Sequence, residues 1–232
     1  MSTITSNLQA VKARIAAAAH AAGRAAEDVT LLAVSKTFAA QRVYECAGAG
    51  QHAFGENYLQ EALDKIEALR TLNPGALNLE WHFIGPIQSN KTRSIAENFL
   101  WVHGIERERI ATRLNEARPP ALPPLNVCIQ VNVSGEASKS GVAPGDAMAL
   151  AQAIRGLPRL RLRGLMAIPE PTPDTTLRRR RFASLRELMA TLVAQGHPLD
   201  TLSMGMSDDL EDAIAEGATL VRIGTAIFGA RA

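Results

Sequence analysis

A lysine closes an apolar run near the start of the chain, and its chemistry could define a covalent site. The run reads Leu-Leu-Ala-Val-Ser-Lys over residues 31–36, so Val34 and Lys36 would share one face of a strand. Burial disfavours the charged form of an amine, and a neutral amine is a nucleophile. Lys36 is therefore a candidate for a Schiff base with a carbonyl compound. The alternative is an ordinary strand-end lysine whose ammonium group lies in water or pairs with a carboxylate.

Two clusters of Gly, Ser and Thr near the C-terminus could bind a phosphate group. Residues 203–207 read Ser-Met-Gly-Met-Ser, and Gly224-Thr225 follow a strand that carries Arg222. Glycine lets backbone N–H groups approach an anion closely, and the hydroxyl groups add further donors. Ser207 could instead be only the N-cap of the helix that follows it. Together the clusters predict a phosphate-binding cup on two adjacent strands.

The elements that would position these residues alternate between strand and helix along the chain. A first helix is expected over residues 6–22, before the alternation begins. Strands are expected at 30–36, 52–55, 79–85, 100–104, 126–133, 160–168, 201–204 and 220–228. Helices are expected at 39–49, 58–69, 89–99, 107–118, 144–155, 177–194 and 208–215. The pattern predicts an α/β fold, a single (β/α)8 TIM barrel with an extra N-terminal helix; an open doubly wound sheet is the alternative.

Length and composition limit the class of protein. The 232 residues suit one domain spanning 1–232, and 47% apolar residues supply a core. A formal net charge of +2 gives no case for nucleic acid or an anionic membrane surface. We find no signal-peptide pattern and no apolar run long enough to cross a bilayer. Cys46 and Cys128 lack metal-binding spacing and fit a reducing compartment, so we expect a soluble cytoplasmic protein.

Two other groups of residues have ordinary explanations. His52, His82 and His103 lie in or beside three expected strands and could be metal ligands, but they lack paired spacing, so we interpret them as barrel-wall or loop histidines. The four arginines at 178–181 open a helix without interleaved aromatic residues, which indicates a solvated face rather than a nucleic-acid site.

Seven stretches spread over the chain resemble those of the pyridoxal phosphate homeostasis protein family, whose fold is that of the N-terminal barrel of alanine racemase. They are LLAVSKT (31–37), FGENY (54–58), WHFIGPIQSNK (81–91), SKSG (138–141), RGLMAI (163–168), SMGMSDD (203–209) and VRIGTAIFG (221–229). The resemblance implies an alanine racemase N-terminal domain-like barrel that binds pyridoxal 5'-phosphate (PLP).

The resemblance also implies a role for each matching residue. Lys36 would hold PLP as an internal aldimine, and Arg222 would face the pyridine nitrogen. The other implied site residues are Ser203, Gly205, Ser207, Gly224 and Thr225 in the phosphate cup, with Asn57 and Met166 near the ring. One departure is visible: family members often carry a second lysine two places after the first, and here Phe38 stands there. A role of that lysine in cofactor transfer could not apply, whereas Lys139 remains another amine at the mouth.

The resemblance implies a carrier more than an enzyme. An arginine facing the pyridine nitrogen leaves it unprotonated and weakens the ring as an electron sink. A two-base racemase also needs an acid/base group opposite the lysine, which alanine racemase takes from a tyrosine of an additional C-terminal domain that we do not expect here. The sequence has only Tyr44 and Tyr58. An amino-acid racemase and a Schiff-base aldolase acting on a sugar phosphate are the alternatives.

We therefore expect a PLP-binding protein of intracellular vitamin B6 homeostasis and supply, without catalytic activity and with indirect effects on amino-acid metabolism. Its expected partners are PLP and, as transient recipients, PLP-dependent apo-enzymes. No nucleic acid or membrane partner is expected, and we expect a monomer.

Overall fold

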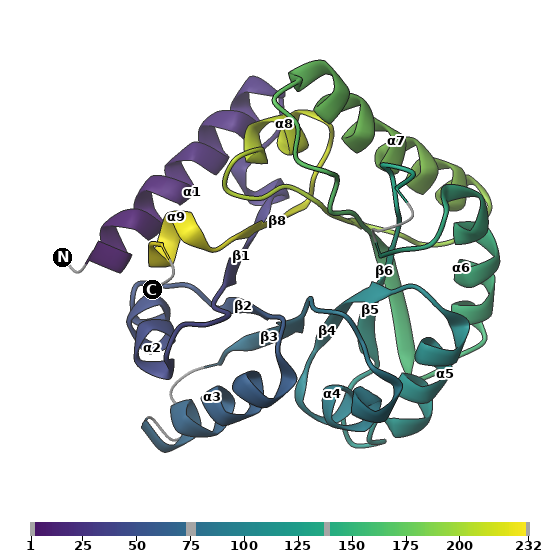
Figure 1. Ribbon diagram of the computed structural model, residues 1–232, viewed down its shortest axis with the longest axis horizontal. Coiled ribbons are helices and arrows are strands. Elements are labelled where there is room, and N and C mark those ends of the chain that lie inside the picture. Colours follow the sequence, from purple (N-terminus) through teal and green to yellow (C-terminus); the bar gives the residue numbers. More distant parts are fainter. Residues whose placement is uncertain (1–2, 73–77, 137–139, 231–232) are drawn as a thin grey trace.

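The chain folds into a closed barrel of eight parallel strands surrounded by helices (Figure 1). This computed structural model describes residues 3–72, 78–136 and 140–230. The strands are β1 (Thr30–Val34), β2 (Ala53–Glu56), β3 (Glu80–Phe83), β4 (Trp101–Ile105), β5 (Leu125–Gln130), β6 (Leu160–Met166), β7 (Thr201–Ser203) and β8 (Leu220–Ile223). Each strand pairs with the next, and β8 pairs back onto β1. The predicted barrel is confirmed, and the open sheet is wrong.

The helices lie around the outside of the barrel (Figure 1). They are α1 (Thr3–Ala21), α2 (Ala40–Gly48), α3 (Leu59–Leu72), α4 (Thr92–Asn98), α5 (Glu108–Ala117), α6 (Ala147–Arg155), α7 (Thr175–Ala194), α8 (Leu210–Ala215) and α9 (Thr225–Phe228). The extra N-terminal helix is confirmed: α1 buries Leu8, Val11 and Ile15 and packs against α8 and α9, beside the strands expected to carry the phosphate cup. Within the described ranges, we find no helix that could span a membrane.

The alternation of side chains along the strands separates two cores. In β1, Leu31 and Ala33 belong to the large apolar cluster between the barrel and the helices. Leu32 and Val34 belong to a small cluster inside the barrel. Lys36 lies two residues after Val34 and beyond the strand, so the alternation by itself does not determine its direction.

Six strands end earlier than the sequence predicted, namely β1, β3, β5, β6, β7 and β8, and two of these ends shape the site. β1 ends at Val34, so Lys36 lies two residues beyond it, in a turn. β8 ends at Ile223 rather than at residue 228, because Gly224 (φ −114°, ψ −75°) leaves the extended conformation. The N–H groups of Ile227 and Phe228 then donate to the Gly224 carbonyl oxygen and form the single turn of α9. The bodies of these strands are as predicted, whereas their C-terminal ends are turns.

Candidate functional site

A cavity of about 200 Å3 lies at the C-terminal ends of the strands. It is lined by Val34, Lys36, Asn57, Ile84, Ile168, Met206, Ser207, Asp208, Arg222, Gly224 and Thr225. Six of the nine residues predicted for the site are among these: Lys36, Asn57, Ser207, Arg222, Gly224 and Thr225. The cavity therefore brings an amine, a guanidinium group and two hydroxyl groups together from the ends of three strands, β1, β7 and β8.

The turn that carries Lys36 is anchored on its N-terminal side by a buried ion pair. Ser35 Oγ donates to Glu56 Oε1 (2.6 Å), and Lys65 Nζ donates both to Glu56 Oε1 (2.5 Å) and to the Ser35 carbonyl oxygen (2.8 Å). Neither charged side chain is more than 3% exposed. Burial raises the pKa of the Glu56 carboxyl, and the charge of Lys65 and the two hydrogen bonds offset part of that rise.

The C-terminal side of the same turn is anchored through α3. Thr37 has φ +68°, a left-handed conformation that is unfavourable for a residue with a branched side chain. Its backbone N–H donates to Glu61 Oε1 (2.5 Å), and that oxygen also pairs with Lys65 Nζ (3.0 Å). Ser35 and Thr37, the two residues that flank Lys36, are therefore held in place by one hydrogen-bond network. The only sequence signal for it is the i,i+4 spacing of Glu61 and Lys65 on α3.

Arg222 is buried with its guanidinium group fixed to the backbone of neighbouring strands. Nη1 donates to the carbonyl oxygen of Ser203 (2.6 Å), and Nη2 donates to that of Ala167 (2.9 Å). Burial lowers the pKa of Arg222 to about 10, and the negative charge of Asp209 opposes this shift. The group therefore remains a cation at neutral pH and presents a fixed positive charge to the cavity.

Three predicted site residues do not line the cavity. Ser203 Oγ accepts a hydrogen bond from Arg222 Nη1 (2.8 Å) and bonds His103 Nδ1 (2.8 Å), so it lies in the barrel interior behind the arginine. Met166 packs in an apolar cluster inside the barrel. Contacts of these two residues and of Gly205 with a ligand stay predictions.

Glycine relieves close packing at two positions of the expected phosphate cup, strongly at Gly205 and more weakly at Gly224. Gly205 has φ +95°, and a Cβ atom there would lie 2.6 Å from the Cβ of Ala213 on α8. A Cβ atom on Gly224 would lie 3.1 Å from the Val34 carbonyl oxygen. Gly205 thus lets α8 approach the strand end, and Gly224 lets the end of β8 pass close to β1 beside Lys36.

Asn57 supplies a polar atom that the fold leaves unused. Its Oδ1 is buried and has no hydrogen-bond partner within the described part of the chain. A Cβ atom on Gly85 would come within 2.2 Å of the Asn57 carbonyl oxygen, so glycine at the end of β3 permits this arrangement. Buried polar atoms are normally satisfied, and an exception inside a cavity indicates a place for a ligand or a water molecule.

Five lining residues were not predicted for the site: Val34, Ile84, Ile168, Met206 and Asp208. Val34 was expected only to share a strand face with Lys36. Ile84 could have been predicted, because it lies two residues after the inward-pointing His82 and side chains alternate between the two faces of a strand. The others lie in loops, where no periodicity operates.

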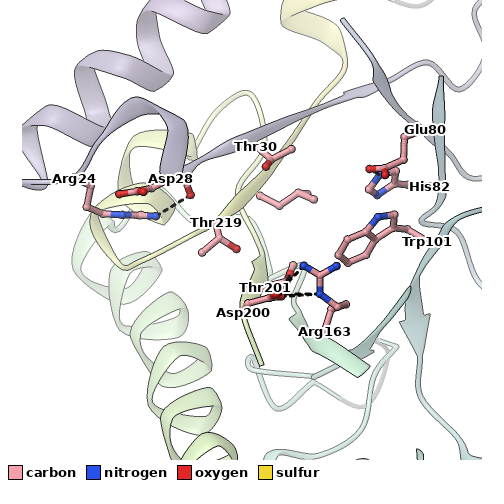
Figure 2. Close-up of a pocket in the computed structure, with 11 residues that line it drawn as sticks. Arg24, Asp28, Thr30, Glu80, His82, Trp101, Arg163, Asp200, Thr201 and Thr219 are labelled. Carbon is pink, nitrogen blue, oxygen red and sulfur yellow. Dashed lines mark hydrogen bonds and ion pairs between the residues drawn. The ribbon is translucent and has the colours of Figure 1, made fainter. Parts of the chain in front are cut away.

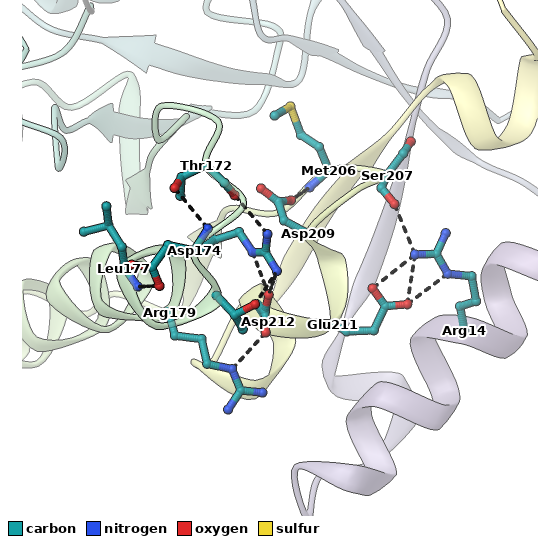
Figure 3. A network of polar contacts seen from close by, with 12 residues as sticks. Arg14, Thr172, Asp174, Leu177, Arg179, Met206, Ser207, Asp209, Glu211 and Asp212 are labelled. Carbon is teal, nitrogen blue, oxygen red and sulfur yellow. Dashed lines mark hydrogen bonds and ion pairs between the residues drawn. The ribbon is translucent and has the colours of Figure 1, made fainter.

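The loop between β7 and α8 is attached to the N-terminal helix (Figure 3). Arg14 on α1 donates to the Ser207 carbonyl oxygen (3.1 Å) and to both carboxylate oxygens of Glu211 on α8. Within the loop, the Met206 N–H donates to Asp209 Oδ1 (2.6 Å). Because Met206 and Ser207 line the cavity, α1 holds one of its walls.

Replacing Arg14 with methionine should loosen this wall without unfolding the protein. The Arg14–Glu211 pair is 40% and 51% exposed, so we expect a loss of only about 0.5–1 kcal/mol in the free energy of unfolding. Amide hydrogen exchange of residues 203–212 should become faster by about two- to fivefold. Arg42→Met, which removes another exposed ion pair, is the control. Unchanged exchange in residues 203–212 would contradict this role of α1.

The arginine run at 178–181 forms ion pairs at three of its four positions, and none of the four residues is buried, so the predicted solvated face also carries salt bridges. Arg178 Nε and Arg179 Nε donate to the two oxygens of Asp212 on α8 (2.6 and 2.8 Å), and Arg181 bonds Glu170 (3.0 Å). Figure 3 shows the Asp212 contacts. Burial opposes ionisation of Asp212, but the hydrogen bonds from Arg179 and Arg178 outweigh it and lower the pKa of the carboxyl.

The histidines do not form a metal site among the described residues, which contain no group of three or more His, Cys, Asp or Glu side chains able to hold a metal ion. His82 and His103 lie inside the barrel and bond each other, Nδ1 to Nε2 (2.9 Å). His52 is exposed.

Comparison with known proteins agrees with the fold and covers nearly all of the chain. The family model for the alanine racemase N-terminal domain matches residues 6–232. A pyridoxal phosphate homeostasis protein of Pseudomonas aeruginosa is 64% identical over 100% of this chain and 97% of its own length. The protein of that name from Escherichia coli K12 is 55% identical, covering 100% and 98%.

Solved structures of other proteins have the same fold. A protein from Bifidobacterium adolescentis superposes with a TM-score of 0.90 at 36% identity, covering 97% of this chain and 94% of that one. PipY of Synechococcus elongatus PCC7942, solved with PLP bound, has a TM-score of 0.83 at 33% identity and covers 97% and 100%. The chain therefore belongs to the pyridoxal phosphate homeostasis protein family, whose barrel is that of the alanine racemase N-terminal domain.

Proposed function

We propose that this chain, as a single domain over residues 1–232, binds PLP in the cavity at the C-terminal mouth of the barrel and takes part in PLP homeostasis. The observation that carries the proposal is the joint presence of Lys36, Arg222 and Thr225 on the wall of one cavity. The names of its relatives and the PLP bound to PipY support the choice of cofactor.

The chemistry of the cavity fits each part of PLP. Lys36 supplies the amine that would anchor the aldehyde carbon, and the cationic Arg222 would face the pyridine nitrogen. The hydroxyl groups of Ser207 and Thr225, with the backbone at Gly224, would bind the phosphate group. The unpartnered Oδ1 of Asn57 offers a polar contact to the ring substituents. We propose Met166, Ser203 and Gly205 as supporting residues behind this wall.

A carrier role follows from two features of the site. Bound PLP supplies an electron sink, which is strongest when its ring nitrogen is protonated. The charge of Arg222 disfavours a proton on a nitrogen facing it. The described lining residues also include neither Tyr44 nor Tyr58, so neither tyrosine is placed to act as a second base opposite Lys36. We propose that the protein stores PLP and delivers it to apo-enzymes, as a cytoplasmic monomer; its free, buried Cys46 and Cys128 support a reducing compartment.

Reductive trapping tests the cofactor and its anchor. Purified protein incubated with PLP should show a visible absorption band that shifts on borohydride reduction, and peptide mapping should find the pyridoxyl label on Lys36. Lys36→Ala should take up no stable label, whereas Lys91→Ala, which removes an exposed lysine, should be labelled like the wild type. A wild-type protein that takes up no label would overturn the proposal, and conversion of L- to D-alanine by the PLP-loaded protein would overturn the carrier role.

A further inference from the structure

A chain of hydrogen bonds crosses the barrel interior from Arg222 to the opposite mouth. Ser203 Oγ, the acceptor of a hydrogen bond from Arg222 Nη1 (2.8 Å), also bonds His103 Nδ1 (2.8 Å). His103 Nε2 bonds His82 Nδ1 (2.9 Å), and His82 Nε2 bonds Glu80 Oε1 (2.8 Å). Ser203, His103 and His82 are all buried. The chain therefore links the wall of the PLP cavity to a carboxylate at the other end of the barrel.

The two ends of the chain fix the direction of every hydrogen bond in it. A guanidinium group can only donate, and an ionised carboxylate can only accept. Glu80 therefore accepts the proton of His82 Nε2, which leaves His82 Nδ1 to accept from His103 Nε2–H. His103 Nδ1 then accepts from the Ser203 hydroxyl, whose oxygen accepts from Arg222. Each inner group donates once and accepts once, as cooperative chains require.

The ionisation of the members agrees with this direction. Burial lowers the pKa of His82 and of His103, so both imidazole rings are neutral near pH 7, and the charge of Arg222 adds to the effect on His103. The hydrogen bond from His82 lowers the pKa of Glu80, which keeps its carboxylate ionised. Two neutral rings between a cation and an anion need no further counter-ion.

Glu80 lies on the wall of a second cavity, of about 430 Å3, at the N-terminal ends of the strands (Figure 2). Its side chain is 45% exposed, so it meets solvent while His82 does not. The ring of Trp101 stacks on His82 with centroids 5.2 Å apart and planes 5° apart, and the Arg163 guanidinium carbon lies 4.7 Å from the centroid of the Trp101 ring. This stacking holds the imidazole plane in the orientation that the chain needs.

We propose that Glu80 is a positioning residue for Arg222, acting through this chain from the opposite mouth of the barrel. Without an acceptor at position 80, His82 moves its proton to Nδ1. The Nδ1–H of His82 and the Nε2–H of His103 would then point at each other. His103 must therefore change tautomer as well, and Ser203 Oγ receives hydrogen bonds from both His103 and Arg222. That oxygen can accept both hydrogen bonds, but the buried Ser203 O–H then has no acceptor, so the hydroxyl reorients and its hydrogen bond from Arg222 Nη1 weakens. The guanidinium group loses part of its fixed orientation. The consequence for PLP rests on the proposed function of Arg222.

The wild-type protein without PLP provides the first test. Long-range 1H–15N NMR spectra report which ring nitrogen of each histidine carries the proton. We expect the Nε2–H tautomer for both His82 and His103. A proton on Nδ1 of either ring would overturn the inference, and this result depends neither on a variant nor on bound PLP.

Two variants of Glu80 provide the second test. Glu80→Gln keeps an acceptor of the same shape, whereas Glu80→Met keeps the length and removes the acceptor. In the protein without PLP, the Arg222 guanidinium N–H signals should be slowly exchanging in the wild type and Glu80→Gln, and faster in Glu80→Met. PLP binding should weaken about tenfold in Glu80→Met and about twofold or less in Glu80→Gln, as expected when a hydrogen bond to a charged group is weakened.

The outcomes separate this inference from the proposed function. Arg222 signals and histidine tautomers that are the same in Glu80→Met and wild type would overturn the role of Glu80, even if PLP binds Lys36 as proposed. A wild-type protein that shows the expected tautomers and Arg222 signals but binds no PLP would overturn the proposed function and leave the positioning of Arg222 standing. If Glu80→Met does not fold, the inference is tested by the histidine tautomers of the wild type and by the Arg222 signals of Glu80→Gln, which should match those of the wild type.

Discussion

Replacing Lys65 with methionine is expected to lower the free energy of unfolding by about 3–5 kcal/mol, because it leaves a buried carboxylate without its counter-ion. Lys65 Nζ contacts Glu56, Glu61 and the Ser35 carbonyl oxygen, and its side chain is 3% exposed. Methionine fills a similar volume, so the loss is electrostatic rather than a cavity. Urea denaturation followed by circular dichroism measures the change. PLP loading should fall as well, because the turn that carries Lys36 loses an anchor.

The pH dependence identifies the carboxylate responsible. In Lys65→Met the folded-state pKa of Glu56 is expected to rise further above its value in the unfolded chain, because the lysine that offsets burial is gone. A carboxyl whose pKa is raised by folding stabilises the folded state at low pH, and this contribution is lost as the pH rises through the folded-state pKa. The stability of the variant relative to that of the wild type should therefore fall as the pH rises above the ordinary pKa of a glutamate.

A second substitution provides the control. Glu56→Gln combined with Lys65→Met removes both charges and keeps the acceptor for Ser35 Oγ, so it should recover most of the lost stability and the altered pH dependence. A single Lys65→Met variant that is as stable as the wild type at every pH would contradict the role given to the ion pair.

Replacing Gly164 with alanine is expected to destabilise the barrel by at least about 3 kcal/mol or to prevent folding, because the backbone itself blocks the new side chain. A Cβ atom there would lie 1.8 Å from the carbonyl oxygen of Thr201 and 3.0 Å from its Cα. Gly164 pairs with Thr201 across β6 and β7, so relief would require the two strands to separate. Thermal unfolding and soluble yield measure the effect.

Gly48 is the matched control for this substitution. It is the last residue of α2, its φ is not positive, and a Cβ atom there would meet nothing within 4 Å. Gly48→Ala should be neutral or stabilise by up to about 1 kcal/mol, because alanine has less freedom to lose on folding. Equal effects at the two positions would contradict the steric explanation.

The sequence predicted the bodies of the strands well, because buried strands are continuous apolar runs and depend little on their partners. It also brought Lys36, Asn57 and Arg222 to one end of the barrel, since the C-terminal ends of parallel strands meet there. The strand ends were less predictable: Gly224, where β8 ends, lies close to Val34, a residue far away in the sequence. Such an approach leaves no local signal.

The hydrogen-bond partners inside the barrel also could not be predicted from the sequence. Alternation places His103 and Ser203 on the inner face, but their hydrogen bond depends on the stagger of the strands around the barrel, which local patterns do not determine. For the same reason the hydrogen bond between Ser203 and Arg222 could not be predicted from the sequence. Lys139 lies outside the described residues, so its place at the mouth stays a prediction.

The polar chain through the barrel constrains how this protein can change over evolutionary time. Each of Ser203, His103 and His82 donates once and accepts once, so a single substitution leaves at least one buried neighbour with an unsatisfied hydrogen-bonding group. The fitness effect of one change then depends on whether the next has already occurred, which is epistasis imposed by hydrogen-bond direction. Mutations in this chain should be accepted together or in compensating pairs, whereas the apolar residues around the barrel can drift one at a time.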